Sequence, residues 1–262
     1  MGFRMKSFIL TMLMVSSSLF SSAIAEAEGD LPEQVRLSLT DDSAEVVVSW
    51  ITADYADGEV EWGLSKDILA FSSTGINKTY GADSWDGVIH SATMDGLLPA
   101  TEYHYRVGDE IGGWSSIFSF STEPEIDSRV RIGIVADMDV TNAAEDVVNS
   151  MSNNNLDLVL FSGDISYAYD ATRFWDEVEG DEWDEWGRQY EPLSSTVPTM
   201  FAVGNHENEE QNGCEGCGYQ AYLSRIDMPF EASGSDSEFW YSFNYSMFHI
   251  VSISSEHDYS AN

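Results

Sequence analysis

A short apolar stretch, residues 156–161, leads into the residues of this chain that could do chemistry. Ser162 and Gly163 follow it, then Asp164, and Tyr167 comes three residues later. The apolar run is typical of a strand buried in an α/β sheet, and such sheets bind ligands at the carboxyl ends of their strands. A carboxylate and a phenol at one strand end favour a hard or highly charged metal ion. Taken alone, however, these residues are more typical of a turn and of packing.

Two other apolar runs end in the same way. Residues 130–135 are followed by Asp137, and residues 199–203 by Asn205 and His206. Neighbouring parallel strands lie about 4.8 Å apart, so three such strand ends can converge on one or two metal ions. A shared metal centre therefore explains the three runs better than coincidence does.

The order of these motifs resembles a known family. Asp137 in Ala-Asp-Met-Asp, then Gly-Asp-Ile-Ser-Tyr, then Gly-Asn-His-Glu, is similar to the first three metal-binding motifs of the calcineurin-like metallophosphoesterases. The tyrosine three residues after the aspartate, and the run at residues 183–193, resemble the purple acid phosphatases in particular.

The resemblance implies a role for each matched residue. Asp137 and Tyr167 would hold a ferric ion, and Asp164 would bridge it to a divalent metal, which could be zinc, manganese or iron. Asn205 would bind the divalent metal, and His206 would be the catalytic residue beside the substrate phosphate. The implied activity is that of an acid phosphatase on phosphate monoesters. A phosphodiesterase or nucleotidase of the same superfamily is the alternative.

The chain departs from the family pattern at two places. The first motif usually reads Gly-Asp-x-Gly, whereas Ala136 and Asp139 replace the two glycines here. The family's fourth and fifth motifs, Val-x-x-His and Gly-His-x-His, do not occur before Asn262. The simplest interpretation is a catalytic domain truncated at its carboxyl end, and we expect the 262-residue chain to bind metal poorly and to turn over little or nothing. A secreted binding protein that has lost catalysis is a second interpretation.

The first 25 residues have the layout of a secretory signal peptide. Basic residues precede an apolar run that is shorter than the roughly 20 residues of a membrane span, and a small-x-small site ends at Ala25. We therefore expect a secreted protein, in which Cys214 and Cys217 form a tight local disulfide. Secretion also makes the sequons at Asn77 and Asn244 candidate glycosylation sites.

The charge of the chain limits the kinds of molecule that it is expected to bind. A formal net charge of −35 repels nucleic acid and anionic lipid, so we expect neither as a partner. A small phosphorylated substrate remains compatible if metal ions supply local positive charge. With 43% hydrophobic and 13% aromatic residues, the chain is expected to be globular, and its length permits two modest domains. The sequence leaves the oligomeric state open.

Residues 29–122 are predicted to form an all-β sandwich, because short alternating runs recur between Asp- and Gly-rich turns. Residues 97–107 resemble the corner of a fibronectin type III domain, where a tyrosine bonds back to the backbone. Trp50 would pack between the sheets, and His90 and His104 would be packing or surface residues. The six expected strands are residues 35–39, 45–51, 59–62, 88–94, 103–107 and 117–120.

A linker over residues 123–129 leads to the second domain, residues 130–262. A helix predicted over residues 143–151 would complete a βαβ unit, and the acidic run at 172–190 would be a helix with a solvated face. Residues 238–254 would add two strands, with His249 in the core and His257 as a further site candidate. The predicted fold class is an all-β, fibronectin type III-like sandwich followed by an incomplete α/β metallophosphoesterase sandwich.

Overall fold

The computed structural model describes residues 31–54, 57–81, 85–168, 179–209 and 218–257. The predicted signal peptide and the predicted disulfide between Cys214 and Cys217 lie outside the described residues. Among the helices that are described, none combines the length and the apolar character needed to span a bilayer.

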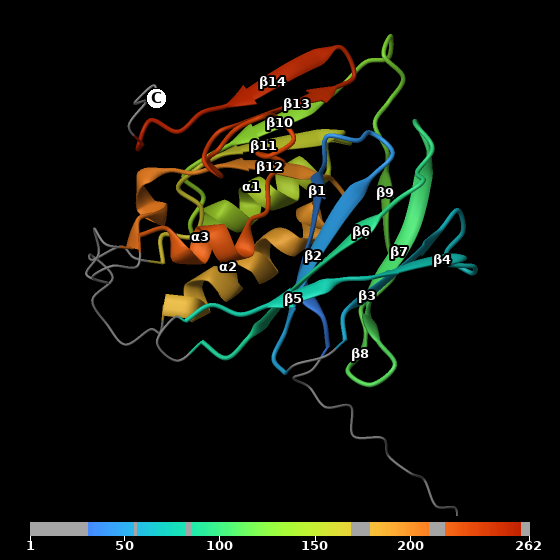
Figure 1. The fold of residues 1–262 in the computed structure, drawn as a ribbon, viewed down its shortest axis with the longest axis horizontal. Helices are drawn as coiled ribbons and strands as arrows, with labels where there is room; N and C mark the ends of the chain where they lie inside the picture. Colours follow the sequence, from blue (N-terminus) through green and yellow to red (C-terminus); the bar gives the residue numbers. More distant parts are fainter. Residues whose placement is uncertain (1–30, 55–56, 82–84, 169–178, 210–217, 258–262) are drawn as a thin grey trace, which may run out of the picture.

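The amino-terminal part is a sandwich of two antiparallel sheets (Figure 1). The first has the strand order β1-β2-β6-β5, and the second has the order β4-β3-β7-β8, with β9 also paired to β7. Burial alternates along β7, as expected of a strand with one face on the core. The strands are β1 (Glu33–Leu39), β2 (Val46–Thr52), β3 (Glu59–Gly63), β4 (Phe71–Thr74), β5 (Ile76–Lys78), β6 (Val88–Met94), β7 (Glu102–Asp109), β8 (Gly113–Trp114) and β9 (Phe118–Ser121).

The sandwich core confirms three predictions. Trp50 is fully buried between the sheets, and the N–H of Leu98 donates a hydrogen bond to the hydroxyl of Tyr103 at 3.0 Å, which is the predicted tyrosine corner. His90 is a packing residue: it is fully buried, stacks on Trp50 with a centroid distance of 5.1 Å, and bonds to the Thr52 hydroxyl at 2.7 Å.

The second part is built on a parallel sheet in the order β10-β11-β12. These strands are β10 (Ile132–Val135), β11 (Leu158–Ser162) and β12 (Thr199–Ala202). Helix α1 (Asn142–Ser152) connects β10 to β11, so the predicted βαβ unit is confirmed. The helix begins where the Thr141 hydroxyl accepts a hydrogen bond from the N–H of Ala144 at 3.2 Å.

Helices cover one face of this sheet and a hairpin covers the other (Figure 1). Helix α2 (Glu179–Ser194) packs with α1 on the helical face, while β13 (Tyr241–Tyr245) and β14 (Phe248–Ser252) pair on the opposite face. A 3₁₀ helix η1 (Asn205–Glu207) follows β12, and α3 (Gln220–Arg225) comes next in the chain. The predicted fold class, a β-sandwich followed by an α/β domain, is thus observed.

Some expectations were wrong in detail. His249 is exposed rather than in the core, because β14 presents most of its side chains to solvent. Helix α2, in contrast, has the expected solvated face, with Glu185 and Arg188 exposed, while Trp183 and Trp186 are each only 1% exposed. The short strands β4, β5 and β8 were not expected, as they carry two to four residues and no buried alternation.

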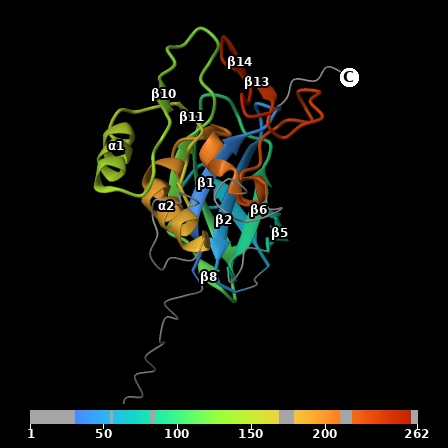
Figure 2. The same cartoon turned by 90° about the vertical axis from the view of Figure 1, so that its left-hand side faces the viewer.

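The two parts share a core. Helix α2 lies between α1 and the sandwich (Figure 2). Arg225, only 2% exposed, pairs with Asp184 at 2.8 Å, donates to the Tyr80 hydroxyl at 2.9 Å, and lies 4.5 Å from the Trp85 ring. Its carbonyl accepts a hydrogen bond from Arg36 at 2.7 Å, and burial, followed by the charge of Arg225, lowers the pKa of Arg36 to about 10. Side chains from both parts therefore hold the sandwich and the second part together.

Candidate metal centre

The three parallel strands end level with one another, which brings their following loops together. Val135, Phe161 and Phe201 are paired across the sheet. Beyond the strands, the N–H groups of Asp137 and Met138 donate to the carbonyls of Gly163 and Asp164 at 3.2 and 3.1 Å. The loop after β10 is therefore fixed to the loop after β11 by backbone hydrogen bonds.

Four non-glycine residues in these loops have left-handed backbone conformations. Their φ angles are 51° at Asp137, 64° at Asp139, 54° at Asp164 and 55° at Tyr167. Each such conformation costs on the order of 1–2 kcal/mol, and they cluster at functional sites. Asp139 stands where the family usually has a glycine, and aspartate is among the side chains that tolerate this region. The turn thus forms despite the departure from the family motif.

Tyr167 lies at the centre of the site. Its hydroxyl donates to Asp137 Oδ1 at 3.0 Å, and its ring lies 4.2 Å from the His206 ring, centroid to centroid. Burial raises the pKa of Tyr167 above its ordinary value, and the hydrogen bond to Asp137 and the neighbouring carboxylates act in the same direction. The free chain therefore holds a neutral phenol against a carboxylate.

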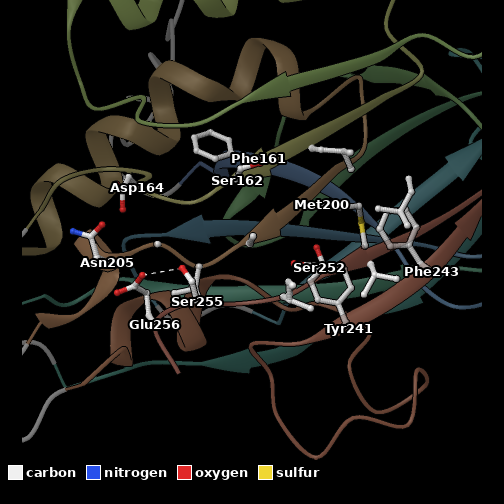
Figure 3. Close-up of a pocket in the computed structure, with 17 residues that line it drawn as sticks. Phe161, Ser162, Asp164, Met200, Asn205, Tyr241, Phe243, Ser252, Ser255 and Glu256 are labelled. Atoms are coloured by element: carbon white, nitrogen blue, oxygen red, sulfur yellow. Dashed lines mark hydrogen bonds between the residues drawn. The ribbon is translucent and has the colours of Figure 1, made fainter. Parts of the chain in front are cut away.

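Asp164 joins the loop after β11 to the loop after β12. Its Oδ1 accepts the N–H of His206 at 3.0 Å. Asp164 and the exposed Asn205 line the same end of a cavity of about 400 Å³ between β12 and the β13–β14 hairpin (Figure 3). The rest of that cavity is lined by apolar side chains, among them Met200 and Phe243, and by polar ones, among them Ser252 and Glu256.

A close approach of two glycines makes this contact possible. A Cβ atom on Gly204 would lie 2.2 Å from Asp164 Oδ1, and one on Gly163 would lie 2.6 Å from the Gly204 nitrogen. Gly163 also has a φ of 85°. Only glycine fits at either place, so the two loops are in backbone contact.

Comparison with known proteins agrees with this geometry. The model of the purple acid phosphatase N-terminal domain matches residues 32–122, and the calcineurin-like phosphoesterase model matches residues 130–258. The chain belongs to the purple acid phosphatases. This family implies a dinuclear metal centre.

Relatives in plants cover most of this chain. It is 33% identical to purple acid phosphatase 15 of Arabidopsis thaliana, over 85% of this chain and 49% of that protein. It is 35% identical to phosphoenolpyruvate phosphatase of Allium cepa, over 86% of this chain and 47% of that protein. A purple acid phosphatase from yellow lupin (Lupinus luteus) seeds superposes with a TM-score of 0.69 at 25% identity, covering 84% of this chain and 44% of that structure. The chain thus spans about half the length of these proteins.

The donors that this purple acid phosphatase chain brings together fit a hard cation. Two carboxylates, one phenol and one amide oxygen lie at one edge of the sheet, on Asp137, Asp164, Tyr167 and Asn205. Oxygen donors of this kind suit highly charged or hard ions. Within the described ranges, however, no three His, Cys, Asp or Glu side chains gather in a way that could hold a metal. The described donors alone are therefore few for two ions.

His257 lies in a different environment from these donors. Its ring stacks on Phe239 at 3.8 Å between centroids, and its Nδ1 bonds to the Ser254 hydroxyl at 2.8 Å. Burial lowers the pKa of His257. The ring of His257 thus packs on Phe239 and bonds to Ser254 rather than to the carboxylates of the site.

Glu207 is the residue of the site that the sequence did not single out. It is only 1% exposed, and its carboxylate accepts three backbone hydrogen bonds from Gly204, Asp164 and Ile165. Burial raises the pKa of Glu207, while those three bonds act in the opposite direction. The position of a carboxylate directly after Asn-His was a possible signal of this role in the sequence. Two of its three backbone partners, however, lie 42 and 43 residues away in the chain, in the loop after β11.

Proposed function

We propose that this chain contributes Asp137, Asp164, Tyr167 and Asn205 to a dinuclear Fe(III)–M(II) centre that hydrolyses phosphate monoesters. Asp137 and Tyr167 would hold the ferric ion, Asp164 would bridge, and Asn205 would bind zinc, manganese or iron. The observation that carries the proposal is the convergence of three strand ends, with the Tyr167 hydroxyl 3.0 Å from Asp137 and the His206 ring against Tyr167.

The side chains have separate tasks in this proposal. Metal ions at such a site supply Lewis acidity and activate water. Asp137 and Asp164 would carry the negative charge that holds the ions, and the hydrogen bond from the His206 N–H keeps Asp164 in place. The imidazole of His206, half-buried on Tyr167, would donate a hydrogen bond to a phosphoryl oxygen or protonate the leaving oxygen.

The setting of the activity is part of the same proposal. The substrate would be a small phosphorylated molecule, consistent with the name of the Allium cepa relative. The apparent signal sequence and the two sequons support a secreted glycoprotein. With a net charge of −35, the protein would act on neither nucleic acid nor membrane lipid.

A pair of matched substrates tests the activity. The chain, loaded with Fe(III) and Zn(II) at acidic pH, is given p-nitrophenyl phosphate or its bis-ester, and monoester turnover is expected to exceed diester turnover. The expected rate is low, because the family's fourth and fifth motifs do not occur in this chain. Asp164→Asn should reduce turnover to background, whereas Asp146→Asn, on the exposed face of α1, should not.

Other outcomes point to other functions. Faster diester hydrolysis would assign the chain to the phosphodiesterase branch. Turnover that survives in Asp164→Asn would show that the proposed centre is not its source. Metal binding without any turnover would favour a secreted binding protein.

A further inference from the structure

We propose that Glu207 is a positioning residue that sets the arrangement of the two loops carrying Asp164, Tyr167, Asn205 and His206. This inference rests on the function proposed above, because it concerns the same site. Glu207 itself is fully enclosed and would bind neither metal nor substrate.

The contacts of the Glu207 carboxylate bridge the two loops. Oε2 accepts the N–H of Gly204 at 2.7 Å and the N–H of Asp164 at 2.9 Å, while Oε1 accepts the N–H of Ile165 at 2.7 Å. The first donor belongs to the loop after β12, and the other two belong to the loop after β11. One side chain thus ties together strand ends that carry different donors.

The three N–H groups need this carboxylate. They lie where the chain leaves the sheet, next to Gly163 and Asp164 with φ angles of 85° and 54°. Successive N–H groups in such turns form a concave anion site, and an ionised acceptor gives bonds about twice as strong as a neutral one. A buried N–H left without an acceptor costs on the order of 1–3 kcal/mol.

A second bond between the loops runs in the opposite direction. The N–H of His206 donates to Asp164 Oδ1 at 3.0 Å. The loop after β12, which Glu207 holds, therefore also fixes the direction of the proposed bridging carboxylate. The backbones of Gly163 and Gly204 approach so closely at this place that neither residue has room for a side chain. A movement of either loop would therefore change both the direction of Asp164 and the contact of His206 with Tyr167.

Glu207→Gln tests the proposal, with Glu209→Gln as the matched control. Glutamine keeps the size of the side chain but replaces one acceptor oxygen by an NH₂ group that faces backbone N–H donors. Glu209 is also fully buried, and its carboxylate accepts the N–H of Ala221 at the start of α3. Both variants are expected to lower stability, so stability alone does not distinguish them.

Iron affinity and the structure of the metal-free loops distinguish the two variants. Apparent Fe(III) affinity, followed by visible absorption from the iron-bound tyrosinate, should fall about 10–100-fold in Glu207→Gln and stay near wild type in Glu209→Gln. In the metal-free chain, NMR should show loss of the contact between the Tyr167 and His206 rings, and about tenfold faster exchange of the Asp164 and Ile165 amides, in Glu207→Gln alone.

Equal behaviour of the two variants would overturn the proposal. If Glu207→Gln keeps the ring contact, the amide protection and the iron affinity of Glu209→Gln, then Glu207 only stabilises the fold. If the wild-type chain itself shows no tyrosinate absorption with iron, the proposed metal centre fails, while the ring contact and amide exchange still decide the role of Glu207.

Discussion

At the scale of single residues, the site is held in conformations that isolated residues avoid. Asp137, Asp164 and Tyr167 all have positive φ angles, and each is fixed by hydrogen bonds to a neighbouring loop. Strain of this kind persists only where the surroundings determine it. The three residues are therefore oriented before any ligand arrives, which reduces the reorganisation that binding would require.

His90 predicts how acid affects the sandwich. It is fully buried between Trp50, Thr52 and Asn77, and burial lowers its pKa to about 4, while the charge of Asp109 acts in the opposite direction. An unfolded histidine titrates near 6.5, so between these values the unfolded state binds the proton first. Stability present at neutral pH is therefore lost as the pH falls towards 4, by about 1–2 kcal/mol between pH 7 and pH 5.

Urea unfolding of wild type and His90→Gln at the two pH values measures this effect. The histidine contribution is the part of the pH dependence that the variant lacks, because other titrating groups are common to both proteins. An identical pH dependence in both proteins would show that His90 does not titrate on unfolding in this range.

At the scale of elements, α2 protects the free edge of β1. Glu191 Oε2 accepts the N–H of Val35 at 3.1 Å, and the Ser194 hydroxyl donates to the Val35 carbonyl at 2.8 Å. Glu191→Ala should lower the free energy of unfolding by about 1–3 kcal/mol, because it leaves a strand N–H without its acceptor. Glu185→Ala, at an exposed position of the same helix, should change it by less than about 0.5 kcal/mol in the same urea titration. Equal effects of the two substitutions would mean that the Glu191 bond adds no stability.

Sequence pattern predicted the elements that carry a strong periodicity. The parallel strands, α1 and six sandwich strands follow from buried apolar runs between turn residues. Strand β8 has two residues and β5 three, too few for any period, and the exposure of β14 depends on which neighbours cover it. In the same way, the strand ends could locate Asp137, Asp164 and Asn205, whereas the role of Glu207 depends on backbone groups of a distant loop.

At the scale of the whole molecule, the two parts are expected to unfold together. The core around α2 includes Ile51, Tyr80 and Trp85 from the amino-terminal part, and Arg225 bonds to Tyr80 from the other part. Tyr80→Phe removes the acceptor of that bond and should cost about 1–2 kcal/mol. Hydrogen exchange should show the same loss of protection in β2 and in β11. A loss confined to β2 would indicate two independently folding domains.

The shared dinuclear centre is tested most directly by titrating the chain with Fe(III) and following visible absorption. Total iron uptake is a poor measure, because a chain with a net charge of −35 binds cations over its surface. Absorption from an iron-bound tyrosinate reports the site itself. We predict a weak, saturable band in the wild type that is absent in Tyr167→Phe and reduced in Asp137→Asn. A band of equal strength in Tyr167→Phe, or iron uptake with no band in the wild type, would contradict the assignment.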